Sequence, residues 1–374
     1  MAADGLPVPF FDWKALFDER SDDYLRIIAS TASAGAFILQ DAVDRFEVQL
    51  AAFLGVRQVV GLSDGTNAML LGLRAAGLAP GDEVLLPGHA FIAAAQAIHF
   101  AGGVPVPVEL GDDWLIDPAA VRAAIGPRTR AIMAVHVNGR LCAMDELREI
   151  ADDHGLALFE DAAQALGATL DGKGSGSWGR WAAFSFYPSK TLGSFGDGGA
   201  IATNDDALAD QLRAMRNHGA GPDKILRADC GLWGTNSRLD NLQAAILTFK
   251  LGWYGQCVDQ RRAIARRYHD AFADLDLDLP PAPDRDPRHF DIFQNYELCS
   301  DRRDALRDHL QRSGIGTIVQ WGGNGIHRFR NLGFTQQLPR TDRFFDRSLL
   351  LPMNHLLSDA QVDRVIDAVR GFHR

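Results

Sequence analysis

Short apolar runs alternate with helical patterns through the first half of the chain. The apolar runs, which we interpret as buried strands, cover residues 58–62, 83–87, 104–108 and 131–135. Helical patterns separate them at 68–75, 92–101 and 118–125. Strands that alternate with helices in this way form a mostly parallel sheet covered by helices on both faces. We therefore predict an α/β fold with a mostly parallel central sheet.

The sequence changes character after residue 252. An acidic, proline-rich stretch at 274–287 precedes one more strand and further helices, and 374 residues are enough for two domains. We predict a large domain over 1–252 and a smaller C-terminal α/β domain over 253–374. The pairs Arg261–Arg262 and Arg266–Arg267 lie on a long helical stretch and are expected to form a solvated face.

Charge and cysteine content narrow the classes of function. A formal net charge of −10 without a long basic run argues against nucleic acid and anionic membranes as partners. The four cysteines contain no C-x-x-C pair, so neither a disulfide framework nor a metal site is indicated. The sequence also lacks a run of about eighteen apolar residues. We predict a cytoplasmic protein with no membrane span.

An acid and a lysine follow two of the apolar runs. Asp161 ends the run that begins at Leu156, and Lys190 follows the run 184–187. Ligands of open α/β sheets bind beyond the carboxyl ends of strands. A pyridoxal phosphate site needs a lysine that binds the cofactor covalently and an acid that pairs with the pyridinium nitrogen. A lysine at a strand end is most often a solvated charge, so these two residues alone leave both interpretations open.

A polar turn at 63–67 joins the first apolar run to a helix. Free amides and the helix dipole make such a turn an anion site. The alternative is a plain turn whose helix is capped by Ser63 or Thr66. Gln164, three residues past Asp161, would share a face with it on a helical turn. The glycines at 172–176 fit no nucleotide-binding fingerprint and predict the turns of a hairpin.

Four motifs occur in a specific order: DAAQ at 161–164, GSGSWG at 174–179, SFYPSK at 185–190 and GDGGA at 196–200. In this order they resemble the sugar aminotransferases of the DegT/DnrJ/EryC1/StrS family, which are fold type I pyridoxal phosphate enzymes. The resemblance extends from about Pro9 to the C-terminus. It implies the fold type I architecture and pyridoxal 5'-phosphate as cofactor.

The resemblance also implies roles for individual residues. Lys190 and Asp161 would be catalytic. The cofactor would be bound by Gly65, Thr66, Phe91, Asp161, Gln164, Ser185, Lys190 and Asn236. Among these, Phe91 would stack on the ring, although its sequence context alone indicates a core residue. Asn236 matches an asparagine that reaches the neighbouring subunit's cofactor phosphate, which implies a homodimer with shared active sites.

The implied reaction transfers an amino group from glutamate to a nucleotide-linked keto sugar, as in deoxyamino sugar biosynthesis for lipopolysaccharide O-antigen. Residues 37–39 and 65–68 look more like relatives that aminate C3 than C4. The stretch 320–327 departs from the histidine, tyrosine and proline cluster of many relatives, and Leu166 replaces a common histidine. The substrate candidates are Trp321, His327 and Arg238.

Three alternatives stay open at this point. The chain could aminate a free keto-inositol, or it could catalyse a different reaction on the same cofactor, such as dehydration. A relative with histidine at the lysine position is a dehydratase, so Lys190 favours transamination. The third alternative is a non-catalytic regulatory protein, against which the retained Lys190, Asp161, Gln164 and Ser185 argue.

Overall fold

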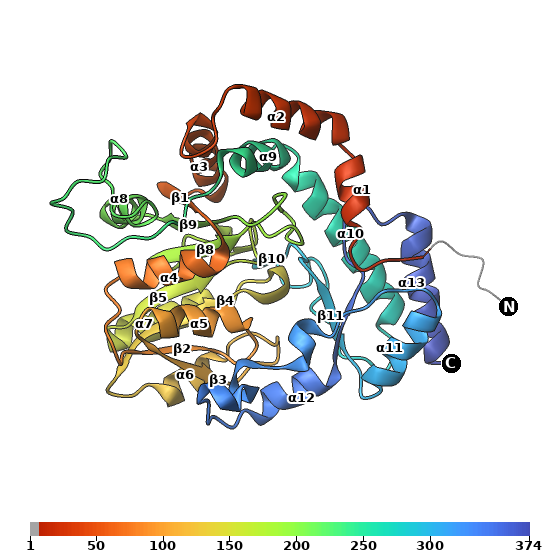
Figure 1. Cartoon of the computed structure of the whole chain (residues 1–374). Coiled ribbons are helices and arrows are strands. Elements are labelled where there is room, and N and C mark those ends of the chain that lie inside the picture. The colour runs from red at the N-terminus through yellow and green to blue at the C-terminus, as the bar shows by residue number, and fades with distance from the viewer. Residues whose placement is uncertain (1–6) are drawn as a thin grey trace.

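The computed structural model describes residues 7–374. Its main feature is a seven-stranded sheet with the strand order β1-β9-β8-β5-β4-β2-β3 (Figure 1). The strands are β1 Gln58–Leu62, β2 Glu83–Pro87, β3 Val104–Val108, β4 Thr129–Val135, β5 Ala157–Asp161, β8 Trp181–Ser185 and β9 Gly199–Thr203. Six strands are parallel, and only β9 runs antiparallel to its neighbours β1 and β8. The predicted α/β fold with a mostly parallel sheet is confirmed.

Helices cover both faces of the sheet (Figure 1). They are α3 Asp41–Leu54, α4 Gly65–Ala75, α5 Ile92–Phe100, α6 Pro118–Ala124, α7 Met144–His154 and α8 Asp206–Met215. Helix α4 packs on β8 and β9, whereas α7 packs on β4 and β5. Except for the edge strand β3, the strands are buried almost throughout, as expected for a parallel sheet between two helical layers.

A second hydrophobic core lies in the C-terminal part of the chain. There β11 Tyr296–Cys299 pairs antiparallel with β12 Ser348–Leu351, beside α10 Tyr254–Phe272, α11 Arg303–Arg312 and α13 Asp359–Phe372. Val8 joins this core and bridges to Ile315, so the N-terminal segment packs with the C-terminal part. The domain boundary at residue 252 stays a prediction.

The structure has further helices, short strands and 3-10 turns. They are α1 Trp13–Asp18, α2 Ser21–Ser33, α9 Asn241–Leu251, α12 Pro339–Arg347, β6 Thr169–Leu170, β7 Lys173–Gly174, β10 His289–Phe290 and the 3-10 turns Val137–Gly139, Gln320–Gly323, Ile326–Arg328 and Arg330–Leu332. The antiparallel pairing of β6 with β7 confirms the predicted hairpin. No helix among residues 7–374 is long and apolar enough to cross a membrane.

The predicted solvated face of α10 is wrong for its first arginine pair. Arg261 and Arg262 are only 5% and 7% exposed. The Nη1 atom of Arg261 donates to the carbonyls of Phe293, Gln294 and Met353 at 3.0–3.2 Å. These arginines are buried because α10 lies between the two cores, where their guanidinium groups bind carbonyls that no strand partner satisfies.

Candidate active site

A cavity of about 600 Å³ lies beyond the carboxyl ends of the parallel strands. The predicted residues that line it are Gly65, Thr66, Phe91, Asp161, Gln164, Ser185, Lys190 and Trp321. They come from segments more than 250 residues apart in the chain, so the fold brings the predicted site together. His136 and Asp197 also line the cavity.

Lys190 lies five residues beyond the end of β8, in a turn closed by its own N–H, which donates to the carbonyl of Tyr187 at 2.8 Å. Burial lowers the pKa of the Lys190 amine to about 8, while the attraction of Asp161 acts in the opposite direction. The neutral amine is therefore far more populated near neutral pH than for an exposed lysine. A lysine that forms a covalent bond to a carbonyl group needs this neutral form.

Asp161 is the last residue of β5 and is 6% exposed. Its Oδ1 accepts the N–H of Ala163 at 3.1 Å, and the other oxygen has no donor among residues 7–374. Burial raises the pKa of this carboxyl group, although the N–H of Ala163 and the charge of Lys190 act against the increase. A buried carboxylate with a free oxygen suits a protonated ring nitrogen as its partner.

Helix α4 directs its N-terminus into the cavity. Its N-cap is Asp64, whose Oδ1 accepts the N–H of Asn67 at 2.8 Å, so the cap is neither of the two residues, Ser63 and Thr66, that the alternative of a plain turn named. The helix instead starts at Gly65, and the backbone amides of Gly65 and Thr66 have no acceptor among the described residues. A Cβ atom on Gly65 would lie 2.9 Å from that of Ser185, so glycine permits this close approach.

These groups together form an anion site. The Thr66 hydroxyl has no partner in residues 7–374, and the Ser185 hydroxyl only accepts the N–H of Tyr187, at 3.3 Å. Two free amides at a helix N-terminus and two hydroxyl donors match the oxygens of a phosphate group. The cavity therefore offers separate positions for a phosphate, a ring nitrogen and a lysine-linked carbon.

Gln164 does not lie on a helix, contrary to the reasoning that placed it on one face with Asp161. The segment after β5 forms turns, and the Gln164 side chain is fixed through its Oε1, which accepts the N–H of Asn138 at 2.7 Å. Its amide nitrogen is left as a donor toward the cavity. Asn138 has a left-handed backbone (φ 59°), and its Nδ2 donates to Glu297 at 2.6 Å.

His136 has a structural role. Its Nε2 lies 3.1 Å from a carboxylate oxygen of Glu160, and its Nδ1 accepts the N–H of Cys142 at 3.2 Å. Glu160 also accepts the N–H groups of Gly176, Trp178 and Gly179. Burial raises the pKa of Glu160, but the contact with His136 and the N–H groups of Gly179 and Gly176 outweigh it, so the pKa is lowered. Both nitrogens of His136 are thus in use, and the pair fixes the end of β5 next to Asp161.

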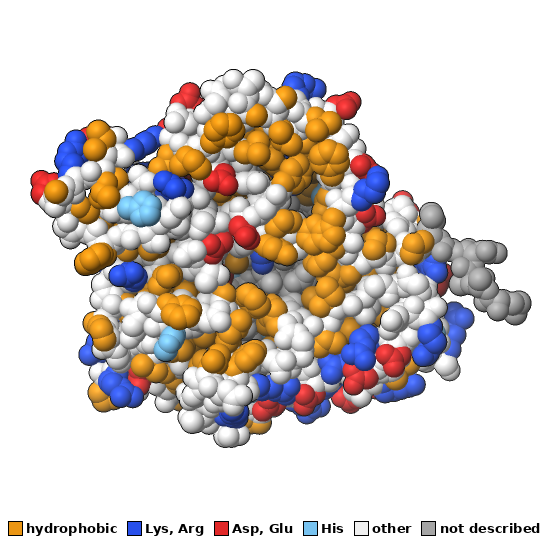
Figure 2. Space-filling model, in the orientation of Figure 1, with side chains coloured by type: hydrophobic (Ala, Val, Ile, Leu, Met, Phe, Trp, Pro, Cys, Tyr) orange, Lys and Arg blue, Asp and Glu red, His pale blue; other side chains and the backbone are white. Residues whose placement is uncertain are grey.

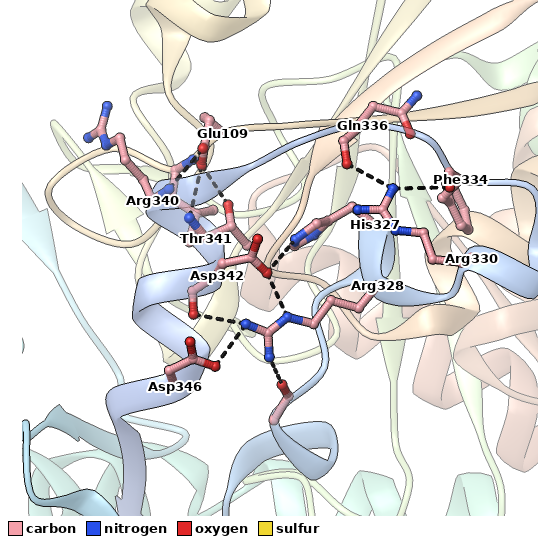
Figure 3. Close-up of polar contacts among 12 residues, drawn as sticks. Glu109, His327, Arg328, Arg330, Phe334, Gln336, Arg340, Thr341, Asp342 and Asp346 are labelled. Atoms are coloured by element: carbon pink, nitrogen blue, oxygen red, sulfur yellow. Dashed lines mark hydrogen bonds and ion pairs between the residues drawn. The ribbon is translucent and has the colours of Figure 1, made fainter.

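The substrate candidates lie in different places. Trp321 has a left-handed backbone (φ 49°), and its ring centroid lies 6.1 Å from that of Phe91, which is 51% exposed. His327 is fully buried and does not line the cavity; its Nε2 lies 2.9 Å from Asp342 Oδ1, which also accepts from Arg328 (Figure 3). His327 therefore stabilises the segment that follows Trp321 through its contact with Asp342.

Two other predicted residues do not line the cavity of their own chain. Asn236 is exposed and pairs with Asn217 in an isolated bridge. Arg238 donates to the side chain of Asn217 at 3.1 Å. Neither residue lines the cavity.

A mostly parallel sheet with a half-buried lysine, a buried carboxylate and a helical anion site at its carboxyl edge defines the class of fold type I pyridoxal phosphate enzymes. Comparison with known proteins gives the family. The DegT/DnrJ/EryC1/StrS aminotransferase family matches residues 19–370, and the chain belongs to this family. It is a pyridoxal phosphate-dependent aminotransferase.

Relatives match over nearly their whole length. The dTDP-3-amino-3,4,6-trideoxy-alpha-D-glucose transaminase of Streptomyces venezuelae is 40% identical, with 98% of this chain and 96% of the relative covered. The UDP-N-acetyl-3-dehydro-alpha-D-glucosamine 3-aminotransferase of Acidithiobacillus ferrooxidans is 36% identical, with 97% of each covered. The crystal structure of S. venezuelae DesV has a TM-score of 0.93, 39% identity and 99% coverage of each chain.

One similar protein carries a regulatory name. The pleiotropic regulatory protein of Geobacillus stearothermophilus is 36% identical, with 98% of this chain and 99% of that protein covered.

Proposed function

We propose that this aminotransferase moves an amino group from glutamate to a nucleotide-linked keto-deoxysugar, with the 3-keto sugar favoured over the 4-keto sugar. The observation that carries the proposal is the cavity in which Lys190, Asp161 and the α4 N-terminus meet. The names of the Streptomyces and Acidithiobacillus relatives, both of which specify an amino group at C3, support the sugar and the position.

We propose the following roles for the residues of the cavity. Pyridoxal phosphate, when bound, supplies an electron sink for the electron pair released at the substrate carbon. The amine of Lys190, whose pKa is about 8, would take the proton from that carbon and deliver it to the cofactor. Asp161 would keep the ring nitrogen protonated, and Gln164 would donate to the ring hydroxyl. Phe91 and Trp321 cover the site and exclude water.

The proposal includes a homodimer with shared active sites. Figure 2 shows hydrophobic side chains gathered where α2, α3 and α9 lie, and Leu25, Phe37 and Val48 are 54–70% exposed. Exposed apolar area of this kind is typical of subunit interfaces. In the dimer, the exposed Asn236 of one subunit would reach the cofactor phosphate of the other. A cytoplasmic location and O-antigen as the destination of the product stay predictions.

Loss of a hydroxyl group in the anion site is expected to weaken cofactor binding. Thr66→Val and Ser185→Ala each remove one donor to a charged group, which corresponds to ~1.5 kcal/mol, or about a tenfold higher Kd for pyridoxal phosphate. The measurement is a titration of the cofactor-free protein. Ser177→Ala is the matched control, because that hydroxyl donates to Gly174 in the hairpin. Unchanged affinity in both site variants would place the phosphate elsewhere.

The substrate is tested by offering a panel to the glutamate-loaded enzyme. We expect 3-keto nucleotide sugars to restore the absorption of the pyridoxal form, while 4-keto sugars and a free keto-inositol react more slowly. Selective reaction with a 4-keto sugar would overturn the C3 assignment. Reaction with keto-inositol alone would overturn the assignment of a nucleotide sugar as the substrate. A protein that binds no cofactor would favour the alternative of a regulatory protein.

A further inference from the structure

A glutamine from the C-terminal part of the chain holds the turn that carries Lys190. The Oε1 atom of Gln294 accepts both the N–H and the hydroxyl of Thr191, each at 2.8 Å. Its Nε2 donates to the carbonyl of Ser189 at 3.0 Å. One side-chain amide thus binds the residues on both sides of Lys190.

The turn has few other restraints. Lys190 lies outside any strand or helix, so no ladder of backbone hydrogen bonds fixes it. The amide of Gln294 replaces such a ladder, because it offers an acceptor and a donor spaced like those of a peptide group. Gln294 is only 5% exposed, so water cannot easily replace these bonds when they are lost.

Gln294 is itself fixed by the buried arginine of α10. The Nη1 atom of Arg261 donates to the carbonyl of Gln294 at 3.0 Å and to that of Phe293 at 3.2 Å. Phe293 has a left-handed backbone (φ 50°), a conformation that needs surrounding contacts to persist. The neighbouring Asn295 donates to the Asn138 side chain at 2.8 Å, and the N–H of Asn138 binds Gln164. Gln294 therefore contacts the turn that carries Lys190, while the next residue, Asn295, contacts the segment that fixes Gln164.

We propose that Gln294 is a positioning residue that sets the direction of the Lys190 side chain toward the reacting carbon. The proposal rests on the role of Lys190 in the proposed function. Gln294 does not line the cavity, so it acts only through Ser189 and Thr191. Its loss should change how Lys190 moves the proton while leaving substrate binding nearly intact.

The decisive variant is Gln294→Met, which keeps the volume and removes all three hydrogen bonds. In the full-length protein without cofactor, we expect the Thr191 amide to exchange its hydrogen about 10- to 100-fold faster than in the wild type. In the loaded enzyme, kcat should fall by about 10- to 100-fold, with KM for the sugar changed less than about threefold. The pH at which the visible absorption of the lysine-bound cofactor changes should also shift.

Two further variants keep the test decisive. Gln294→Glu retains the acceptor for Thr191 but sets a carboxylate oxygen against the carbonyl of Ser189, so it should release the turn at least as much as Gln294→Met. Gln361→Ala is the control for general loss of stability, because Gln361 completes the capping box of α13, remote from the cavity. It should leave the Thr191 amide protected and the absorption unchanged.

The possible failures can be told apart. Wild-type Thr191 exchange and wild-type kcat in Gln294→Met would overturn the positioning role. An equal loss of Thr191 protection and of kcat in Gln361→Ala would also overturn the positioning role, since both losses would then follow from lower overall stability. Failure of the wild-type protein itself to bind cofactor at Lys190 would instead overturn the proposed function, and the exchange measurement would still report whether Gln294 holds the turn.

Discussion

Lys190→Ala is expected to lower turnover by about four orders of magnitude or more, because it removes both the covalent link to the cofactor and the group that moves the proton. The visible absorption of the loaded protein should also disappear, since no other amine lines the cavity among the described residues. Both quantities are measured on purified protein after addition of pyridoxal phosphate and removal of the excess.

The chain offers a matched control for this substitution. Lys250 is half-buried, as Lys190 is, and burial lowers its pKa to about 8, as for Lys190. Its Nζ, however, donates to the carbonyl of Gly193 at 2.6 Å and lies over the rings of Tyr24 and Phe195, outside the cavity. Lys250→Met should keep the visible absorption. Borohydride reduction should label the Lys190 peptide, and a label on Lys250 would contradict the assignment.

The sequence predicted those parts of the molecule that are determined by residues close together in the chain. Buried parallel strands are continuous apolar runs, so β1, β2 and β3 lie where the apolar runs placed them. The positions of Asp161 and Lys190 follow from strand ends, because all parallel strands end at one edge of the sheet.

Long-range contacts account for what the sequence did not reveal. Gln294 and Asn138 carry no local pattern, and their function depends on segments more than a hundred residues apart in the chain. Arg261 was expected in solvent because charged residues usually are, and only its three carbonyl partners explain its burial. Conversely, the sequence context of Phe91 alone indicated a core residue, and the resemblance placed it at the cofactor. The side chain is half exposed and lines the cavity, at the N-cap position of α5.

Replacing Asp161 should separate cofactor binding from cofactor activation. Asp161→Asn keeps the size of the side chain and its acceptor for the N–H of Ala163, but it removes the negative charge. A neutral amide cannot hold the proton on the ring nitrogen, so the electron sink is weakened. We expect kcat to fall by about 10²- to 10³-fold, the cost of losing one preorganised electrostatic contact at a reacting group.

The absorption of the lysine-bound cofactor should persist in Asp161→Asn, because Lys190 and the anion site remain. This combination distinguishes Asp161 from Lys190, whose loss removes both signals. Glu160 is the neighbouring buried acid, yet its oxygens accept three backbone N–H groups and contact His136, so Glu160→Gln should mainly lower stability. Turnover of Asp161→Asn within about tenfold of the wild type would mean that the ring nitrogen is not protonated by this residue, because the charge of Asp161 would then contribute too little to the transition state.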